Sequence, residues 1–324
     1  MKKFLFMFFA GVIAFGAIGC GKTTPSDPEI PVYAPGHNWT RAVQNAEFSP
    51  RWGHAGVSYG GEIYIIGGFD GVERNDVYSS ANGQTFVQET ASAAFSARNS
   101  HRVVVFDTGA GEKMVLTGGG YKNEVWESSN GADWGALTLN AEFSGRSGHT
   151  SVVFDSKIWV IGGQNPLFQK DVWSSSNGSL WTEETGDAGF GMRTRHASVV
   201  FDGKIWIIGG IGAGNETMGD VWYSSDGISW TRAVENAEFG PRSNHDVFVY
   251  DEKMWLFGGL DGDGNYVSDR LFYSSDGLTW TQVSVLPTAL YPRRNHINVI
   301  FDGVPYIIGG MGETENYNDS WYSN

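Results

Sequence analysis

Short apolar runs separated by turn residues recur along most of the chain. Within Arg242–Thr281, the segments 247–251, 254–259, 271–277 and 280–281 carry these runs. They are rich in β-branched and aromatic side chains, and Gly, Asp and Ser stand between them. Runs of this length and composition are typical of short strands. The pattern predicts four strands that form one small antiparallel sheet.

The same unit occurs six times. Each copy has an Arg three residues before a His, and successive His residues lie 47 to 51 positions apart. A Gly pair follows the His by thirteen residues in five copies and by seventeen in the second copy. A sheet of four short strands cannot bury both faces alone, so a period near fifty indicates stacking around an axis. Six copies therefore predict six blades.

The repeat also resembles a known family. The pattern Arg-x-x-His, an apolar strand, Asp-Gly-Lys and Ile-Trp-Ile-Ile-Gly-Gly, clearest between Arg193 and Gly210, is similar to the kelch repeat of β-propellers. The resemblance covers about 290 of the 324 residues. It implies an all-β, six-bladed kelch-type propeller, but it says little about activity because propellers host many unrelated functions.

The two ends of the repeat region complement each other. The last copy stops within Asp319–Asn324 and lacks Gly-x-x-Trp-Thr, whereas Gly36–Thr40 has that pattern and no blade of its own. We expect residues 36–324 to form the propeller, with the N-terminal strand as the outermost strand of the last blade. Such closure removes exposed sheet edges.

Turn and aromatic residues refine the prediction for each blade. An Asn-Gly or Asp-Gly pair, as at Asn177–Gly178 and Asp226–Gly227, predicts a tight hairpin between the third and outermost strands because it tolerates positive φ angles. Aromatic residues at matching positions, such as Trp206 and Trp230, are expected to pack between blades rather than to bind a ligand.

The first nineteen residues read as a secretory signal. Lys2 and Lys3 precede an apolar run from Phe4 to Ile18, which is short for a membrane-spanning helix. Ala17-Ile18-Gly19-Cys20 is similar to the lipobox of bacterial lipoproteins, which implies cleavage before Cys20 and lipidation of that residue. An ordinary signal peptide with an incidental Cys is the alternative. Cys20 is the only cysteine in the chain, so an intramolecular disulfide is impossible.

Residues 20–35 are expected to form a lipidated, flexible tether. Four prolines stand among small and polar residues there, without apolar periodicity. Gly21 shows no sign of the inner-membrane retention that an Asp at this position implies in some bacteria. We therefore expect a lipid anchor in a bacterial cell envelope, preferably in the outer membrane, with either leaflet possible.

The charge of the chain argues against nucleic acid as a partner. Removal of residues 1–19 takes away two of the 22 basic residues and none of the 36 acidic ones, which shifts the formal net charge from −14 to −16. Such a surface repels phosphate backbones. We also expect a monomer without a cofactor.

The repeated arginines are the first candidate site. In the usual path of a propeller blade they would form a ring near the channel mouth, where arginines of kelch-like domains often contact acidic ligands. They are Arg51, Arg98, Arg146, Arg193, Arg242 and Arg293. The alternative, favoured because an acid recurs in step, is that each pairs with the acid of its repeat, which is Asp76, Glu124, Asp171, Asp220, Asp269 or Asp319. The six His residues recur identically and are expected to be structural rather than metal ligands.

Departures from the repeat are better candidates, because a binding site must break sixfold symmetry. Arg102 and Asp246 follow the His, where other copies have Ala, Thr or Ile, and Asn298 stands two residues after its His. Arg195 and Arg294 add charge beside the arginine ring. These polar side chains either bind a ligand or form hydrogen bonds and ion pairs with one another.

The loops after the Gly pairs vary in length and content, and variable loops on a rigid scaffold often carry recognition. Their aromatic residues would suit a sugar ring or a peptide; they are Phe69, Tyr121, Phe168, Tyr266 and Tyr317. The segment 261–265 resembles the start of a calcium loop, but it lacks that loop's Gly and Glu, so we expect a plain turn.

No catalytic constellation stands out, so we assign no catalytic residue. The leading hypothesis is a non-catalytic lipoprotein whose propeller binds a glycan or protein ligand through its loop face and channel mouth. The alternative is a carbohydrate-modifying enzyme of the sialic-acid epimerase or mutarotase type, with Arg102, Asp246 and Glu73 as acid/base groups. A scaffold subunit of an envelope complex is a third possibility.

Overall fold

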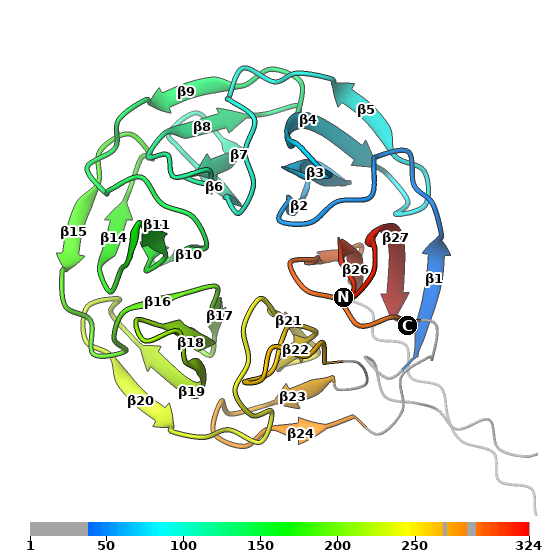
Figure 1. The fold of residues 1–324 in the computed structure, drawn as a ribbon. Coiled ribbons are helices and arrows are strands. Elements are labelled where there is room, and N and C mark those ends of the chain that lie inside the picture. The colour runs from blue at the N-terminus through cyan, green and yellow to red at the C-terminus, as the bar shows by residue number, and fades with distance from the viewer. Residues whose placement is uncertain (1–37, 268–270, 284–289, 324) are drawn as a thin grey trace, which may run out of the picture. The chain divides into compact units, whose positions relative to one another are not determined.

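The computed structural model describes residues 38–267, 271–283 and 290–323, and this part of the chain is all-β. It forms six antiparallel blades around a common axis, with the first strand of each repeat innermost (Figure 1). The prediction of a six-bladed, all-β propeller is confirmed. None of the described residues belongs to a helix that could cross a membrane.

Each blade has four strands, which follow one another along the chain from the axis outwards in blades 1 to 5. Blade 1 contains β2 (Ala55–Tyr59), β3 (Glu62–Phe69), β4 (Glu73–Ser80) and β5 (Val87–Thr90), and blade 2 contains β6 (Arg102–Asp107), β7 (Glu112–Thr117), β8 (Val125–Ser128) and β9 (Gly135–Thr138). Blade 3 contains β10 (Thr150–Phe154), β11 (Lys157–Ile161), β14 (Val172–Ser175) and β15 (Thr182–Thr185), and blade 4 contains β17 (Ala197–Phe201), β18 (Lys204–Gly212), β19 (Thr217–Ser224) and β20 (Thr231–Val234).

The remaining strands complete the ring. Blade 5 contains β21 (Asp246–Tyr250), β22 (Lys253–Phe257), β23 (Phe272–Ser274) and β24 (Thr281–Gln282), and blade 6 contains β25 (Ile297–Phe301), β26 (Val304–Met311), β27 (Asn316–Ser323) and β1 (Trp39–Val43). The short β16 (Arg193–Thr194) joins β18, and β12 (Gln164–Asn165) pairs with β13 (Leu167–Phe168) in a loop.

The N-terminal strand closes the ring as predicted. β1 runs antiparallel to β27, with Trp39 opposite Ser323 and Arg41 opposite Trp321. The Arg41 guanidinium lies 4.7 Å from the centre of the Trp321 ring. Trp39 is buried in a cluster with Trp321 and with Trp255 of blade 5. Blade 6 is therefore built from both ends of the repeat region.

The connection between the third and outermost strands is longer than the tight hairpin that the sequence predicts. β4 ends at Ser80 and β5 begins at Val87. Asn82 Oδ1 accepts hydrogen bonds from the backbone N–H groups of Gln84 and Thr85, at 2.8 and 2.9 Å. The side chain of Asn82 thus organises the loop, and of the Asn-Gly pair only the Gly has a positive φ, 66°.

Aromatic side chains fill the space between neighbouring blades, as expected. A Cβ on Gly227 in blade 4 would lie 2.2 Å from the Trp159 ring of blade 3, and one on Gly277 in blade 5 would lie equally close to Trp206 of blade 4. Each ring therefore lies directly against the backbone of the next blade. This close packing explains why the outer loops need Gly and why the aromatic positions recur.

The residue before each repeat His forms a closed circle, which we call the mouth belt: Gly53, Ser100, Gly148, Arg195, Asn244 and Asn295. Each of them donates its backbone N–H to the carbonyl oxygen of the corresponding residue in the preceding blade, at 2.7 to 3.3 Å. All six have positive φ angles, from 50° to 64°. The mouth belt therefore joins all six blades at one end of the channel.

We predict that Trp39→Ala lowers the free energy of unfolding by about 3 kcal/mol or more, because it removes a buried indole from the closing blade. Chemical denaturation of the full chain measures this effect. Thr40→Ala is the matched control, since the Thr40 side chain is exposed in the same strand. Equal stability of both variants and the wild type would contradict the role of β1 in closure.

Candidate functional site

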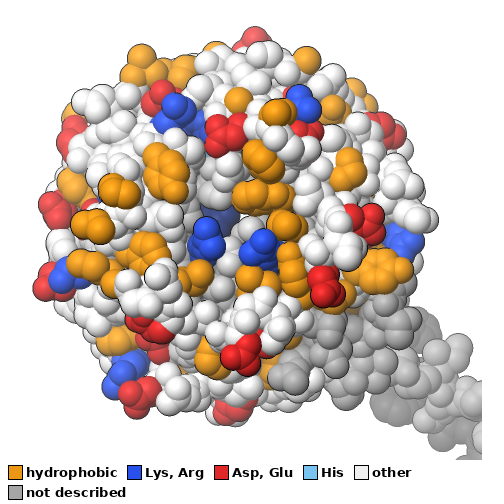
Figure 2. All heavy atoms as spheres, viewed as in Figure 1, with side chains coloured by type: hydrophobic (Ala, Val, Ile, Leu, Met, Phe, Trp, Pro, Cys, Tyr) orange, Lys and Arg blue, Asp and Glu red, His pale blue; other side chains and the backbone are white. Residues whose placement is uncertain are grey.

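A cavity of about 300 Å³ opens on the axis at the mouth belt, and all six belt residues line it. Figure 2 shows the hollow at the centre of this face, with basic side chains at its edge. A second cavity, of about 180 Å³, shares Arg102, Asp246 and His296 with the first. The two cavities therefore meet at these residues, and the channel continues beyond the mouth.

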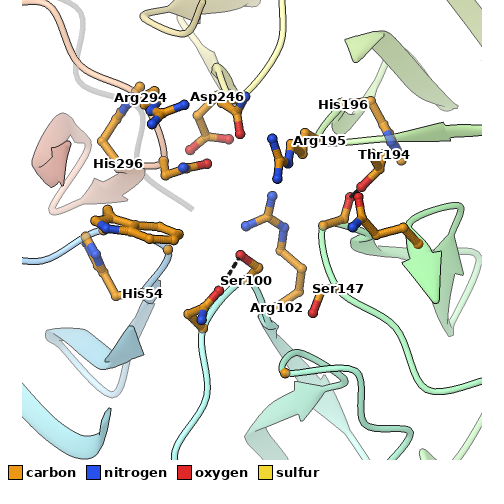
Figure 3. Close-up of a pocket in the computed structure, with 18 of the residues that line it drawn as sticks. His54, Ser100, Arg102, Ser147, Thr194, Arg195, His196, Asp246, Arg294 and His296 are labelled. Carbon is orange, nitrogen blue, oxygen red and sulfur yellow. Dashed lines mark hydrogen bonds between the residues drawn. The ribbon is translucent and has the colours of Figure 1, made fainter. Parts of the chain in front are cut away.

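The residues that depart from the repeat come together at the mouth. Arg102, Arg195, Asp246 and Arg294 line the first cavity, and Asn298 lines the second. Figure 3 shows Arg102, Arg195 and Asp246 reaching towards the centre from different blades, with Arg294 beside them. Charges from blades 2, 4, 5 and 6 thus converge on one space.

Arg195 occupies a position of the mouth belt that disfavours a large side chain. Its φ is 56°, a left-handed conformation that costs an ordinary residue about 1 kcal/mol or more relative to Gly. Blades 1 and 3 have Gly53 and Gly148 at this position, and blades 5 and 6 have Asn. An Arg held here against its backbone preference points to a role for its guanidinium.

Arg195 and Arg294 have no acidic partner among the described residues. Arg294 lies over the Tyr266 ring at 5.6 Å, and its Nη2 donates to Met311 Sδ at 3.3 Å. Partial desolvation at the mouth, followed by repulsion from Arg294, lowers the pKa of Arg195. Two positive charges thus lie at one opening of a protein whose net charge is −14.

Asp246 is held rigidly at the junction of the two cavities. Its Oδ1 accepts from the Val247 N–H at 3.0 Å, and its Oδ2 accepts from the Asn298 N–H of blade 6 at 2.8 Å. Burial raises the pKa of Asp246 to about 6, although Arg102 and these two donors act in the opposite direction. The Asp246 carboxyl group therefore changes its protonation state at a pH of about 6.

Arg102 faces Asp246 from the opposite side of the ring. Burial lowers the pKa of Arg102, and the attraction of Asp246 partly offsets this effect. These two described residues form no ion pair, because the channel separates them. Their charges still attract each other across it. A ligand group or water between them could bond to both.

Comparison with known proteins supports the repeat assignment. The model of the KLHDC2/KLHL20/DRC7 kelch-repeats domain matches residues 195–324, and the kelch motif matches residues 50–80 and 145–174. The chain is a kelch-repeat β-propeller. No curated protein matches it in sequence.

Solved structures agree with this fold. The structure of YjhT is 15% identical to the chain, with a TM-score of 0.69, and the match covers 86% of this chain and 96% of that one. In all, 580 chains of solved structures match this chain. A fold so widely shared does not decide between binding and catalysis, so function must be argued from the site.

The repeated arginines of the kelch propeller lie inside the blades and line neither cavity. At most 1% of each is exposed. Five form ion pairs with the acid of their own repeat: Arg51 with Asp76, Arg98 with Glu124, Arg146 with Asp171, Arg193 with Asp220 and Arg293 with Asp319. For these five the pairing alternative is confirmed. Asp269, the expected partner of Arg242, lies outside the described residues.

These arginines also connect neighbouring blades through their backbones. The Arg51 N–H donates to Tyr317 O of blade 6, and its carbonyl oxygen accepts from Gly310 N–H of the same blade. Its side chain meanwhile bonds to Gly67 O and Asp76 in blade 1. Because each guanidinium is already engaged, we do not place these six arginines in the binding site.

Of the five loop aromatics proposed from the sequence, Tyr121 alone lines the mouth cavity. Its side chain is 54% exposed, and its OH accepts from Gln164 Nε2 at 3.2 Å. Phe69 packs beside Trp52 at 5.2 Å, while Tyr317 stacks on Tyr291 at 6.2 Å. The other two, Tyr266 under Arg294 and Phe168 in β13, also lie outside the cavity lining.

Sequence reasoning missed Trp52, which lines the cavity. The signal was present, because Trp52 follows the repeat Arg where other copies have Asn, Ser, Thr or Arg. Glu73 also lines the mouth, where its Oε1 accepts from Asn99 Nδ2 at 2.9 Å. The mouth therefore combines aromatic, amide, hydroxyl and charged groups.

The repeat histidines add no charge to the mouth. Burial, followed by the neighbouring arginine, lowers the pKa of His54 and His245 to about 3. A Cβ on Gly68 or Gly309 would lie 2.8 Å from His54, so these two glycines enclose the side chain from both sides. In segment 261–265, where a plain turn is expected, Asp261 Oδ1 accepts from the backbone N–H groups of Asp263 and Asn265, both at 2.9 Å.

Proposed function

We propose that this kelch propeller is a non-catalytic binding protein whose ligand, a glycan or a protein, presents an acidic group to the channel mouth. The observation that carries the proposal is that Arg195 and Arg294 stand without an acid, among the described residues, at a cavity of about 300 Å³. Guanidinium groups bind carboxylate, sulfate or phosphate through charge-assisted hydrogen bonds. The two guanidinium groups create a local positive potential at the mouth, which favours an anion there although the protein as a whole is acidic.

The lining of the mouth favours a glycan. Ser100, Ser147 and Gln164 offer hydroxyl and amide groups, and Trp52 and Tyr121 offer ring faces. Sugars combine hydroxyl groups with apolar faces, so a lining of this kind suits them. The cavity has the size of a small-molecule site, although it would also admit an acidic side chain of a protein partner.

We predict that Arg195→Gln and Arg294→Gln each weaken binding of acidic glycans about tenfold or more, because each removes a charge-assisted hydrogen bond. An array of acidic and neutral glycans, followed by calorimetry, measures the effect. Arg232→Gln is the control, since Arg232 pairs with Glu235 at 3.2 Å and lines neither cavity. Acidic-glycan binding that survives both mouth substitutions would refute the proposal.

The second candidate function is a carbohydrate-modifying enzyme of the epimerase or mutarotase type. Asp246 favours it, because a carboxyl group with a pKa of about 6 beside a channel can take up and release a proton at neutral pH. Arg102, across the channel, would then stabilise a developing negative charge on the substrate.

If Asp246 acts as a general base, anomer exchange of a bound sugar should accelerate as the pH rises through about 6 and level off above it, because only the ionised carboxylate accepts a proton. Exchange NMR on the purified protein measures this rate. Asp246→Asn should reduce it to the uncatalysed value. A wild-type rate no faster than that of the free sugar would rule out this activity and leave the binding function.

We further propose that the protein is anchored through lipidated Cys20, in the outer membrane of a bacterial envelope. The proposal rests on the sequence of residues 1–35, which lie outside the described residues. We predict that Cys20→Ala abolishes incorporation of labelled palmitate and moves the protein from the membrane fraction to the soluble fraction. Retention of the label in this variant would exclude the anchor.

A further inference from the structure

The second cavity extends the site beyond the mouth. We propose that it receives the hydroxylated carbon chain of a ligand whose acidic group is held by Arg195 and Arg294, so that the ligand class is a polyhydroxy acid. This inference rests on the proposed binding function and adds to it the part of the ligand that enters the channel.

The second cavity is accessible from the mouth. Arg102, Asp246 and His296 line both spaces, so a ligand seated at the mouth passes these residues as it extends along the axis. The remaining wall is partly built from small residues. Blade 1 contributes Ala55 and Gly56, and blade 4 contributes Ala197. About 180 Å³ of the channel is open beside these residues.

The wall of the second cavity is polar and includes the buried amide of Asn298. Thr150 Oγ1 and Ser198 Oγ lie 2.7 Å apart, and Ser151 stands beside them in the lining. The Nδ2 and Oδ1 atoms of Asn298 are buried without a well-formed hydrogen bond among the described residues, although the amide lies close enough to Asp246 to help lower the pKa of that carboxyl group. A buried amide with unused donors and acceptors is destabilising, so water or a ligand is the expected partner of Asn298.

The donors and acceptors around this space select hydroxyl groups. Asp246 accepts hydrogen bonds, Arg102 donates them, and the Asn298 amide does both. A hydroxyl group also does both, so a chain with one hydroxyl on each carbon can satisfy all three residues as it passes. An apolar chain would leave them unpaired. A polyhydroxy chain can instead displace water and reproduce its hydrogen bonds.

Linear sugar acids of increasing length test the inference on the full chain. Glycolate, glycerate and gluconate carry the same carboxylate and differ in the number of hydroxylated carbons. We expect the affinity, measured by calorimetry, to rise about tenfold from glycolate to gluconate. Asn298→Leu should remove this rise and leave the affinity for glycolate unchanged. The fold should persist, because the substitution keeps the backbone N–H of residue 298 that donates to Asp246.

A second variant changes a residue of another blade in the lining of the second cavity. Ala55→Val, in β2, enlarges an uncharged side chain of the cavity lining, and it should likewise reduce the gain for gluconate while sparing glycolate. Thermal unfolding of both variants verifies that they fold.

The outcomes separate this inference from the proposed function. Absence of binding by all three acids would overturn both. Equal affinities for the three acids, with a loss of binding in Arg294→Gln, would overturn the channel inference and leave the proposed function standing. A gain for gluconate that persists in Asn298→Leu and in Ala55→Val would place the hydroxylated chain elsewhere and overturn the inference.

Discussion

The closed circle of backbone hydrogen bonds at the mouth belt is the constraint on which the site depends. Each belt residue bonds to its counterparts in both neighbouring blades, so one blade cannot tilt without breaking two of these bonds. The same geometry imposes a positive φ on all six residues. Because the belt residues share one backbone conformation, these six positions differ from one another only in side-chain chemistry.

Arginine has two roles in this propeller, one inside the blades and one at the mouth. The repeated arginines are buried and engaged by an acid or a backbone carbonyl, and loss of such a guanidinium would leave its partner uncompensated. Arg195 and Arg294 have no acid in step with them among the described residues, and they face the cavity instead. Whether an Arg is structural or available to a ligand therefore depends on the presence of a partner within its own blade.

The channel arranges charge along its axis. The mouth presents the guanidinium groups of Arg195 and Arg294, which form no ion pair among the described residues, and the carboxylate of Glu73, which accepts from Asn99. The junction below holds Arg102 and Asp246 on opposite sides. Beyond the junction, the lining is made of neutral hydroxyl, amide and small apolar groups. A ligand that matches this order is acidic at one end and hydroxylated along its length. Burial at the junction raises the pKa of Asp246, and the charge of Arg102 across the channel limits that rise.

The number of blades, their strand order and the closure by β1 could all be predicted from the amino-acid sequence, because they follow from local strand patterns and from a repeat whose sheets must be buried. The sequence also pointed to Arg102, Arg195, Asp246, Arg294 and Asn298, since departures from a repeat are visible without coordinates. The sequence also favoured pairing of the repeated arginines with the acids that recur in step. The burial of these pairs inside the blades, and the place of Trp52 at the mouth, became clear only from the folded chain. Direction and burial of a side chain depend on contacts between blades far apart in sequence, and no local pattern encodes them. For the same reason, the meeting of Arg102 and Asp246 across the channel, and the cavity beyond them, could be found only once the ring was closed.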